Sequence, residues 1–148
     1  METTVKSFNQ LSNAELYEIM RLRSEVFVVE QNCVYQDLDN KDQKAIHVLG
    51  KMNEELVGYV RIFKPGDYFE NVAIGRVVVP KSQRRFGYGK LIMQSALKVV
   101  ENEFPKIPIE LSAQTYLIKF YKELGFKTKG EEYLEDGIPH ILMVKKED

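Results

Sequence analysis

The apolar positions of the chain repeat with two different periods, which predicts strands and helices in alternation. Residues 55–64 alternate between apolar and polar side chains, as expected of an antiparallel strand with one buried face. Residues 74–79 are β-branched and almost wholly apolar, so we expect a strand that is buried on both faces. Pro80 ends this strand because proline has no N–H for the ladder. From residue 88 to about 104 the apolar positions have helical spacing, and Pro105 enforces the stop.

The other segments complete a mixed α/β pattern. Ser12 and Glu15 form a capping box before a helix that runs to about Phe27. Further strands are expected over residues 5–8, 45–51, 107–112, 126–129 and 140–144, and a further helix over residues 115–124. The order βαβββαβαββ predicts a central mixed sheet flanked by helices. Without a repeat or linker, residues 1–148 are expected to form a single domain.

Composition excludes several classes of partner. The chain has 148 residues, of which 44% are hydrophobic and 29% charged, as in soluble globular proteins. Its net charge of −1 gives no overall attraction to nucleic acid or to an anionic membrane. No apolar run approaches the roughly 18 residues of a membrane span, and the N-terminus lacks a signal-peptide pattern. Cys33 is alone, and no spacing suggests a metal site. We therefore expect a cytoplasmic protein with no bound metal.

Charge is unevenly distributed along the chain. Residues 81–90 contain four basic residues and no acid, whereas residues 30–42 and 131–136 each contain four acids. If the basic stretch binds phosphates, an acidic stretch would attract a cationic acceptor. The alternative is that both acidic stretches are solvated loops.

The stretch Arg84-Arg85-Phe86-Gly87-Tyr88-Gly89 joins the buried strand to the following helix. The first N–H groups of a helix lack partners and carry the positive end of its dipole. Two glycines permit a sharp turn and the close approach of a ligand, so the junction predicts a site for phosphate or pyrophosphate. A Walker loop requires Ser or Thr where Leu91 stands, and a Rossmann fingerprint requires a small residue where Ile92 stands. The alternative is an ordinary turn with solvated arginines.

The spacing of Arg84, Gly87 and Gly89 resembles the coenzyme A pyrophosphate loop of the GNAT superfamily of N-acetyltransferases. Residues 120–126, F-Y-K-E-L-G-F, resemble the family's F-Y-x-x-x-G-F segment. A narrower similarity to the ElaA-type branch lies in Arg23, residues 26–31 and 35–37, Asp39, and residues 74–77, 113–114, 120–121 and 135–140. The resemblance implies a GNAT-type fold, with a mostly antiparallel sheet splayed between the strands around Val77 and Leu111.

The resemblance also implies the reaction, which is transfer of an acetyl group from acetyl-CoA to a primary amine by direct attack in a ternary complex. A free N–H near Val77 would stabilise the oxyanion. Tyr121 would protonate the leaving thiolate, although it also suits a purely structural place on its apolar stripe. The residues implied to bind the cofactor are Val77, Val78, Val79, Arg84, Arg85, Phe86, Gly87, Tyr88, Gly89, Lys90 and Gln114.

The general base and the acceptor site are less defined. Some family members carry a glutamate at the position of Ala73, so the base must come from elsewhere. Glu30, His47 and His140 are the candidates, and both histidines also suit structural roles. Glu30, Tyr35 and Arg76 are expected to bind the acceptor, a small-molecule or peptide amine. Arg76 needs a partner within its apolar strand, and a structural pair with Glu30 or Asp37 is favoured over a carboxylate of the acceptor.

Two other functions are open at this point. The first is a non-catalytic acyl-CoA-binding sensor or regulatory module. The second is nucleic-acid binding through Arg84, Arg85 and Phe86, which the net charge disfavours. Homodimers are common among small enzymes, and a homodimer is an open expectation here.

Overall fold

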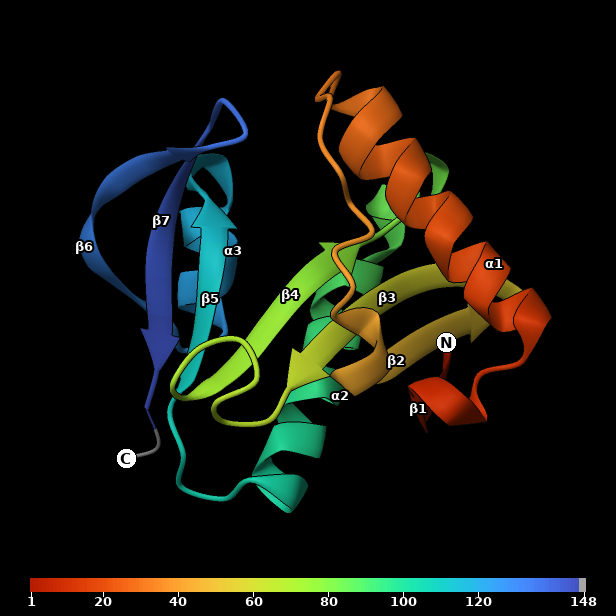
Figure 1. The fold of residues 1–148 in the computed structure, drawn as a ribbon, viewed down its shortest axis with the longest axis horizontal. Helices are drawn as coiled ribbons and strands as arrows, with labels where there is room; N and C mark the ends of the chain where they lie inside the picture. The colour runs from red at the N-terminus through yellow and green to blue at the C-terminus, as the bar shows by residue number, and fades with distance from the viewer. Residues whose placement is uncertain (147–148) are drawn as a thin grey trace.

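The computed structural model describes residues 1–146 and contains one seven-stranded sheet in the order β1-β2-β3-β4-β5-β7-β6 (Figure 1). The strands are β1 (Glu2–Ser7), β2 (Ile46–Met52), β3 (Glu55–Phe63), β4 (Val72–Val78), β5 (Ile109–Gln114), β6 (Lys127–Glu135) and β7 (Ile138–Lys145). The α-helices are α1 (Asn13–Arg23), α2 (Tyr88–Glu103) and α3 (Ile118–Glu123). The order of strands and helices along the chain agrees with the prediction.

Helices cover both faces of the sheet. Apolar residues of α1, such as Ile19 and Leu22, pack with Leu49 and Tyr59 on one face. The larger core lies on the other face, where α2 and α3 pack against the sheet (Figure 1). Its buried members include Val48, Val60, Ile62, Ile92, Ala96, Leu111, Tyr121, Phe126 and Met143.

The sheet is split between β4 and β5. These two strands are parallel and pair only at Val72 with Ile109 and at Ala73 with Glu110, whereas all the other neighbours are antiparallel. Beyond Ala73 the two strands diverge (Figure 1). The predicted mixed, mostly antiparallel sheet that splays between the strands of Val77 and Leu111 is therefore confirmed.

A bulge interrupts β4 at the point of divergence. Tyr59 pairs with Val78 and Arg61 pairs with Gly75, so Arg76 and Val77 lie opposite the single residue Val60. Arg76 has a φ of +51°, which is a costly backbone conformation for a residue with a side chain. A bulge of this kind re-aims side chains and leaves one residue outside the ladder.

Burial corrects two of the strand predictions. The predicted half-buried strand, β3, is buried from Leu56 to Phe63, because α1 covers one face and α2 the other. The strand that was expected to be buried on both faces, β4, is only half-buried from Gly75 to Val77, where it borders a cavity.

Element bounds also differ from the prediction at several places: β5 is Ile109–Gln114 and not 107–112, β7 is Ile138–Lys145 and not 140–144, and the helix expected over 115–124 is a 3-10 turn, Thr115–Leu117, followed by α3. The first strand begins at Glu2 and ends at Ser7. The first α-helix ends at Arg23, and a π-helical segment (Ser24–Glu30) continues it. The capping box of Ser12 and Glu15 is present as predicted. At the other edge of the sheet, β6 continues to Glu135 and is exposed throughout, so it lacks the apolar pattern by which strands are recognised.

None of the helices in residues 1–146 is both long enough and apolar enough to cross a membrane.

Candidate active site

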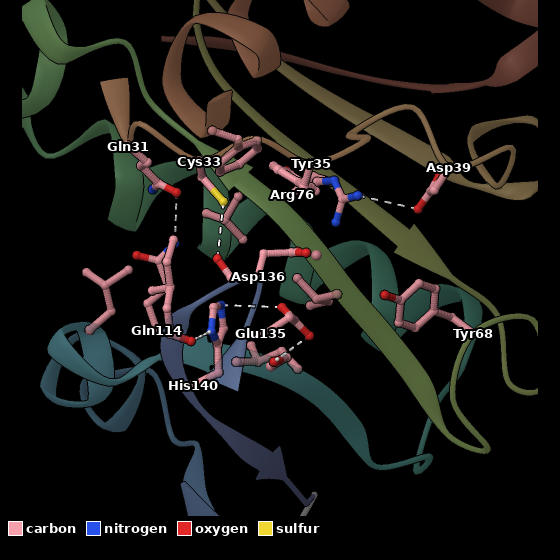
Figure 2. Close-up of a pocket in the computed structure, with 18 of the residues that line it drawn as sticks. Gln31, Cys33, Tyr35, Asp39, Tyr68, Arg76, Gln114, Glu135, Asp136 and His140 are labelled. Carbon is pink, nitrogen blue, oxygen red and sulfur yellow. Dashed lines mark hydrogen bonds and ion pairs between the residues drawn. The ribbon is translucent and has the colours of Figure 1, made fainter. Parts of the chain in front are cut away.

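A cavity of about 430 Å³ lies where β4 and β5 diverge. Its walls come from β4, β5, the segment between α1 and β2, and the turn between β6 and β7 (Figure 2). Two hydrogen bonds join the walls across it. The thiol of Cys33 donates to the carbonyl oxygen of Asp136 over 3.4 Å, and the amide of Gln114 donates to Gln31 over 3.3 Å. The segment after α1 is thus fastened to the β5–β7 half of the sheet.

Beneath this segment lies an ionic network of three arginines and three aspartates, which we call the Arg–Asp network. The arginines, Arg23, Arg61 and Arg76, lie on α1, β3 and β4. The aspartates, Asp37, Asp39 and Asp42, lie between α1 and β2. The ion pairs are Arg23 with Asp37 (2.9 Å) and Asp42 (2.7 Å), Arg61 with Asp39 (2.5 Å) and Asp42 (2.9 Å), and Arg76 with Asp37 (2.7 Å) and Asp39 (3.5 Å).

The network is deeply buried at Arg23 and Arg61, whose side chains are 0% and 1% exposed, and partly exposed at Arg76 and Asp39, which are 19% and 18% exposed. Burial alone would raise the pKa of Asp39, but hydrogen bonding and attraction from Arg61, with the charge of Arg76, hold it at about 2. Burial likewise opposes ionisation of Asp42, and its bonds to Arg23 and Arg61 still lower its pKa. The three carboxylates and three guanidiniums therefore neutralise one another at neutral pH.

Two of the predicted acceptor residues, Arg76 and Tyr35, belong to this system. Arg76 forms its structural pair with Asp37, as the favoured prediction held, and its guanidinium lies 5.8 Å from the ring centre of Tyr35. The hydroxyl of Tyr35 donates to Asp37 over 3.0 Å. Both residues also line the cavity (Figure 2), and a direct role in binding the acceptor stays a prediction.

The third predicted acceptor residue, Glu30, lies elsewhere. It is absent from the cavity wall and pairs with Arg84 through two hydrogen bonds of 2.6 and 2.9 Å. Glu30, which was predicted to bind the acceptor or to act as the base, is therefore paired with Arg84, which was predicted to bind the cofactor. Glu30 lies apart from Tyr35 and Arg76, which line the cavity.

The two histidines differ in position. His47 is fully buried and does not line the cavity. Its Nε2–H donates to the carbonyl oxygen of Asp42 (2.9 Å), and its Nδ1 accepts from the hydroxyl of Tyr59 (2.6 Å). Burial lowers the pKa of His47, so the ring is neutral and structural.

His140, in contrast, lies in the cavity wall and is 7% exposed. Its Nδ1–H donates to the carbonyl oxygen of Ile138 over 2.7 Å. Its Nε2 lies 3.4 Å from the carboxylate of Glu135 (Figure 2). Of the candidates for the base, His140 is the one that the structure brings to the cavity.

Tyr121 of α3 also lines the cavity, and it is only 6% exposed. Burial raises the pKa of its phenol above the ordinary value of 10, with a smaller contribution from Tyr116. Its ring packs edge-on against Phe120 and Phe126. It is thus both a core residue and a protonated donor at the cavity.

The predicted anion loop is the helical turn Lys81–Phe86, followed by Gly87 and α2. Gly87 has a φ of +73° and no side chain to cap the first N–H groups of α2. The side chain of Arg84 reaches back to the carbonyl oxygen of Val79 (3.1 Å). Val77 and Gln114 line the cavity, whereas Val78, Val79 and residues 84–90 do not. These predicted cofactor residues are therefore split between the cavity and the start of α2.

Several cavity residues were not predicted as site residues. They are Phe27, Gln31, Cys33, Gln36, Lys41, Tyr68, Gly75, Ser112, Glu135, Asp136 and Ile138 among others. Glu135 and Asp136 belong to an acidic stretch, which was the available signal. Nothing in the sequence around Ser112 or Tyr68 distinguishes them from ordinary strand and loop residues. Within residues 1–146, no three His, Cys, Asp or Glu side chains are grouped to hold a metal ion.

Comparison with known proteins gives consistent results. A family model described as an acetyltransferase (GNAT) domain matches residues 7–147. Protein ElaA of Escherichia coli K12 is 44% identical over 140 residues, which cover 93% of this chain and 92% of ElaA. The crystal structure of E. coli ElaA has a TM-score of 0.92 at 42% identity, covering 98% of this chain and 99% of that one.

Two further solved structures are informative. An acyl-CoA N-acyltransferase from Pseudomonas aeruginosa has a TM-score of 0.92 at 39% identity, covering 98% of this chain and 99% of that one. An aminoglycoside 6'-N-acetyltransferase complexed with coenzyme A has a TM-score of 0.70 at 18% identity, covering 97% and 96% of the two chains. The second similarity concerns the fold alone.

The Arg–Asp network predicts a loss of stability in acid. The pKa of Asp39 is about 2 in the folded protein against 3.8 for an aspartate free in water, so its stabilisation is complete above about pH 4 and is lost as the pH falls toward 2. A shift of this size corresponds to about 2 kcal/mol. Urea unfolding at a series of pH values from neutral to acidic should show this loss, and D39N should flatten it. An equal flattening by the control E70Q, outside the network, would contradict the assignment.

Proposed function

This chain belongs to the GNAT acetyltransferase family, in its ElaA-like branch, and from that premise we propose that it transfers an acetyl group from acetyl-CoA to a primary amine in a ternary complex. The observation that carries the proposal is the divergence of β4 and β5 beside the bulge at Arg76 and Val77, with an open cavity at that point. The family's use of acetyl-CoA supplies the donor.

The pyrophosphate of acetyl-CoA would bind at the start of α2. The first N–H groups of this 16-residue helix have no side-chain cap, and the helix dipole favours an anion there. The backbone of Gly87 and Gly89 would allow close approach. Arg84, Arg85 and Lys90 would add charge, and Phe86 and Tyr88 would flank the ligand.

The pantetheine arm would lie between β4 and β5. Past Ala73 no residue of β4 pairs with β5, so the backbone of Val77, Val78 and Val79 faces the gap. An extended amide chain can bond to such a strand edge as an added strand would. Gln114, at the end of β5, would contact the arm from the other side. The thioester would then lie at the bulge.

At the bulge, the N–H of Val77 would stabilise the oxyanion. A bulged residue lies outside the regular ladder, which leaves a backbone donor for a ligand. In the reaction, the neutral amine nitrogen attacks the thioester carbonyl carbon, and a tetrahedral intermediate forms. The C–S bond then breaks as the amide forms, the thiolate gains a proton, and the nitrogen loses one.

Tyr121 is the proposed proton donor to the thiolate. A buried phenol is a weak acid, as its raised pKa indicates. A thiolate that departs into the same cavity would also lose solvent, and its own affinity for a proton would rise for the same reason. Desolvation of the thiolate would therefore offset part of the cost of taking a proton from the phenol.

His140 is the proposed acceptor of the amine proton, directly or through a water. Its Nδ1–H is committed to the carbonyl of Ile138, which leaves Nε2 as the nitrogen available toward Glu135. Glu135 and Asp136, also in the cavity wall, would attract the ammonium form of the acceptor. Tyr35 and Arg76 would contact the acceptor from the opposite wall.

Replacement of Tyr121 tests the enzymatic proposal. Y121F should reduce kcat with a suitable amine by roughly 100-fold or more, the typical contribution of a general acid. The rise in Tm produced by saturating acetyl-CoA should stay within about a degree of the wild type, because the ring and its packing remain. Thiol release across an amine panel measures the first quantity, and a thermal melt measures the second.

The control Y116F changes an exposed tyrosine nearby and should leave both quantities unaltered. Wild-type turnover by Y121F would remove Tyr121 from the mechanism. Stabilisation of the wild type by acetyl-CoA without turnover of any amine would instead favour a non-catalytic acyl-CoA sensor.

Replacement of His140 tests the base. H140A should lower kcat by about 100-fold, and added imidazole should restore part of the rate because it can occupy the vacated space and accept a proton. A merely structural histidine would lower the Tm without rescue of the rate by imidazole, and that outcome would contradict the assignment.

The pair between Glu30 and Arg84 predicts an effect on cofactor affinity. A carboxylate held on Arg84 competes with the pyrophosphate for the same guanidinium, so E30Q should bind coenzyme A more tightly. A partly exposed pair is worth about 0.2–1 kcal/mol, which corresponds to a decrease of up to about fivefold in Kd. Isothermal titration measures it, with E25Q as the control. A large fall in kcat with an unchanged Kd would identify Glu30 as the base instead.

A further inference from the structure

A second cavity of about 70 Å³, which we call the side cavity, opens beside the main one. Tyr68, Gly75, Arg76 and Ser112 are among the residues that line both. In Figure 2, Tyr68 lies at the far end of the main cavity from Gln114, which is the proposed cofactor side. A ligand that enters the main cavity with its amine toward the bulge would therefore extend toward the side cavity.

Arg61 lines the side cavity with an unused donor. Its Nη1 and Nη2 groups are bound to Asp39 and Asp42, but its Nε is a buried side-chain donor without a hydrogen-bond partner in residues 1–146. The residue is 1% exposed, and its guanidinium lies 4.9 Å from the ring centre of Phe63. Buried polar atoms are nearly always bonded, so this N–H calls for an oxygen from water or from a ligand.

Gly75 lines both cavities and carries no side chain. A Cβ built at this position would have no atom within 4 Å, and Gly75 does not have a positive φ. Neither the backbone conformation nor a crowded neighbour therefore requires glycine here. Glycine inside a strand is destabilising and often marks close approach by a ligand. The open space next to the bulge suits the body of the acceptor.

The chemistry of the side cavity discriminates between classes of amine. A second ammonium group could pair with the carboxylate of Glu135, which also lines the side cavity, but it would leave the Nε–H of Arg61 without an acceptor, which is costly in a buried site. An alkyl end would exclude water from the Nε–H of Arg61 and would offer no hydrogen-bond acceptor in its place. Only an end that carries an accepting oxygen satisfies this donor.

We propose that the side cavity is a specificity subsite, in which the Nε–H of Arg61 binds a carbonyl or carboxylate oxygen at the end of the acceptor remote from its amine. The acceptor is then a short amino acid or amino amide, and not a polyamine or an alkylamine. This inference rests on the proposed acetyl transfer for its functional meaning, but binding to the subsite can be measured without turnover.

The test compares short ω-amino acids, their carboxamides, and alkylamines and diamines of matching length. With the wild type, kcat/KM should favour an oxygen-bearing acceptor by roughly 10- to 100-fold over its alkylamine, the usual effect of one hydrogen bond to a charged donor. In G75A and G75V the ratio should fall stepwise toward one, as the added side chain takes up space beside both cavities. Both substitutions suit a strand, and a Tm no lower than that of the wild type confirms folding.

A second readout is independent of catalysis. The Nε–H signal of Arg61 in the ¹H–¹⁵N spectrum should shift with an amino acid or amide and not with the matching alkylamine, and G75V should abolish the shift. Comparison of the acid with its amide identifies which form of oxygen is bound. E2V, on the exposed strand β1, is the control for a newly introduced β-branched side chain.

The outcomes separate the two proposals. Equal kcat/KM for alkylamines and oxygen-bearing acceptors, with no shift of the Arg61 signal, would overturn the subsite while acetyl transfer stands. A shift of the signal without turnover of any amine would support the subsite and overturn acetyl transfer to this class.

Discussion

Three guanidinium groups enter the interior on three different elements, and the protein depends on their neutralisation. Arg23, Arg61 and Arg76 cannot stay charged and buried without partners, because the desolvation of an unpaired charge costs several kcal/mol. Their partners come from the polar segment after α1, which has few apolar side chains of its own to bury. Electrostatic pairing thus replaces hydrophobic packing as the force that holds this segment on the sheet. The removal of one partner would leave a buried charge uncompensated, which is strongly destabilising.

The same pairing explains how a strained backbone persists at the bulge. Arg76 adopts a left-handed conformation that costs about 1–3 kcal/mol for a residue of this kind. Its guanidinium is bound to Asp37 and Asp39, so the bulge is fixed from outside the sheet. The bulge in turn lies where β4 leaves β5. The opening of the sheet, the free backbone edge and the wall formed by the segment after α1 are therefore consequences of one arrangement of charges.

Local chemistry made much of this protein predictable. The capping box of Ser12 and Glu15, the stop at Pro105 and the turn at Gly87 each follow from a few neighbouring residues, and the order of strands and helices along the chain followed from the spacing of the apolar positions. The Arg–Asp network did not, because its bonded partners are up to 39 residues apart and nothing local marks which acid meets which arginine. The predicted strand ended at residue 129, whereas β6 continues to Glu135. The residues of β6 lack an apolar strand pattern, and pairing with β7 keeps them in the sheet. The Glu30 contact with Arg84 also required the fold.

The acidic stretches show why charge along the sequence is a poor guide to the charge of a site. Residues 30–42 seemed suited to attract a cation, yet Asp37, Asp39 and Asp42 are neutralised by arginines and Glu30 by Arg84. Of the acids in the other stretch, Glu135 and Asp136 line the main cavity, and the carboxylate of Glu135 is 49% exposed. The attraction for an ammonium group therefore comes from the turn after β6. Glu135 lines the side cavity as well as the main one, so in the proposed subsite it is the Nε–H of Arg61, without a partner in residues 1–146, and not a difference in acidity between the two cavities, that would select an oxygen-bearing end.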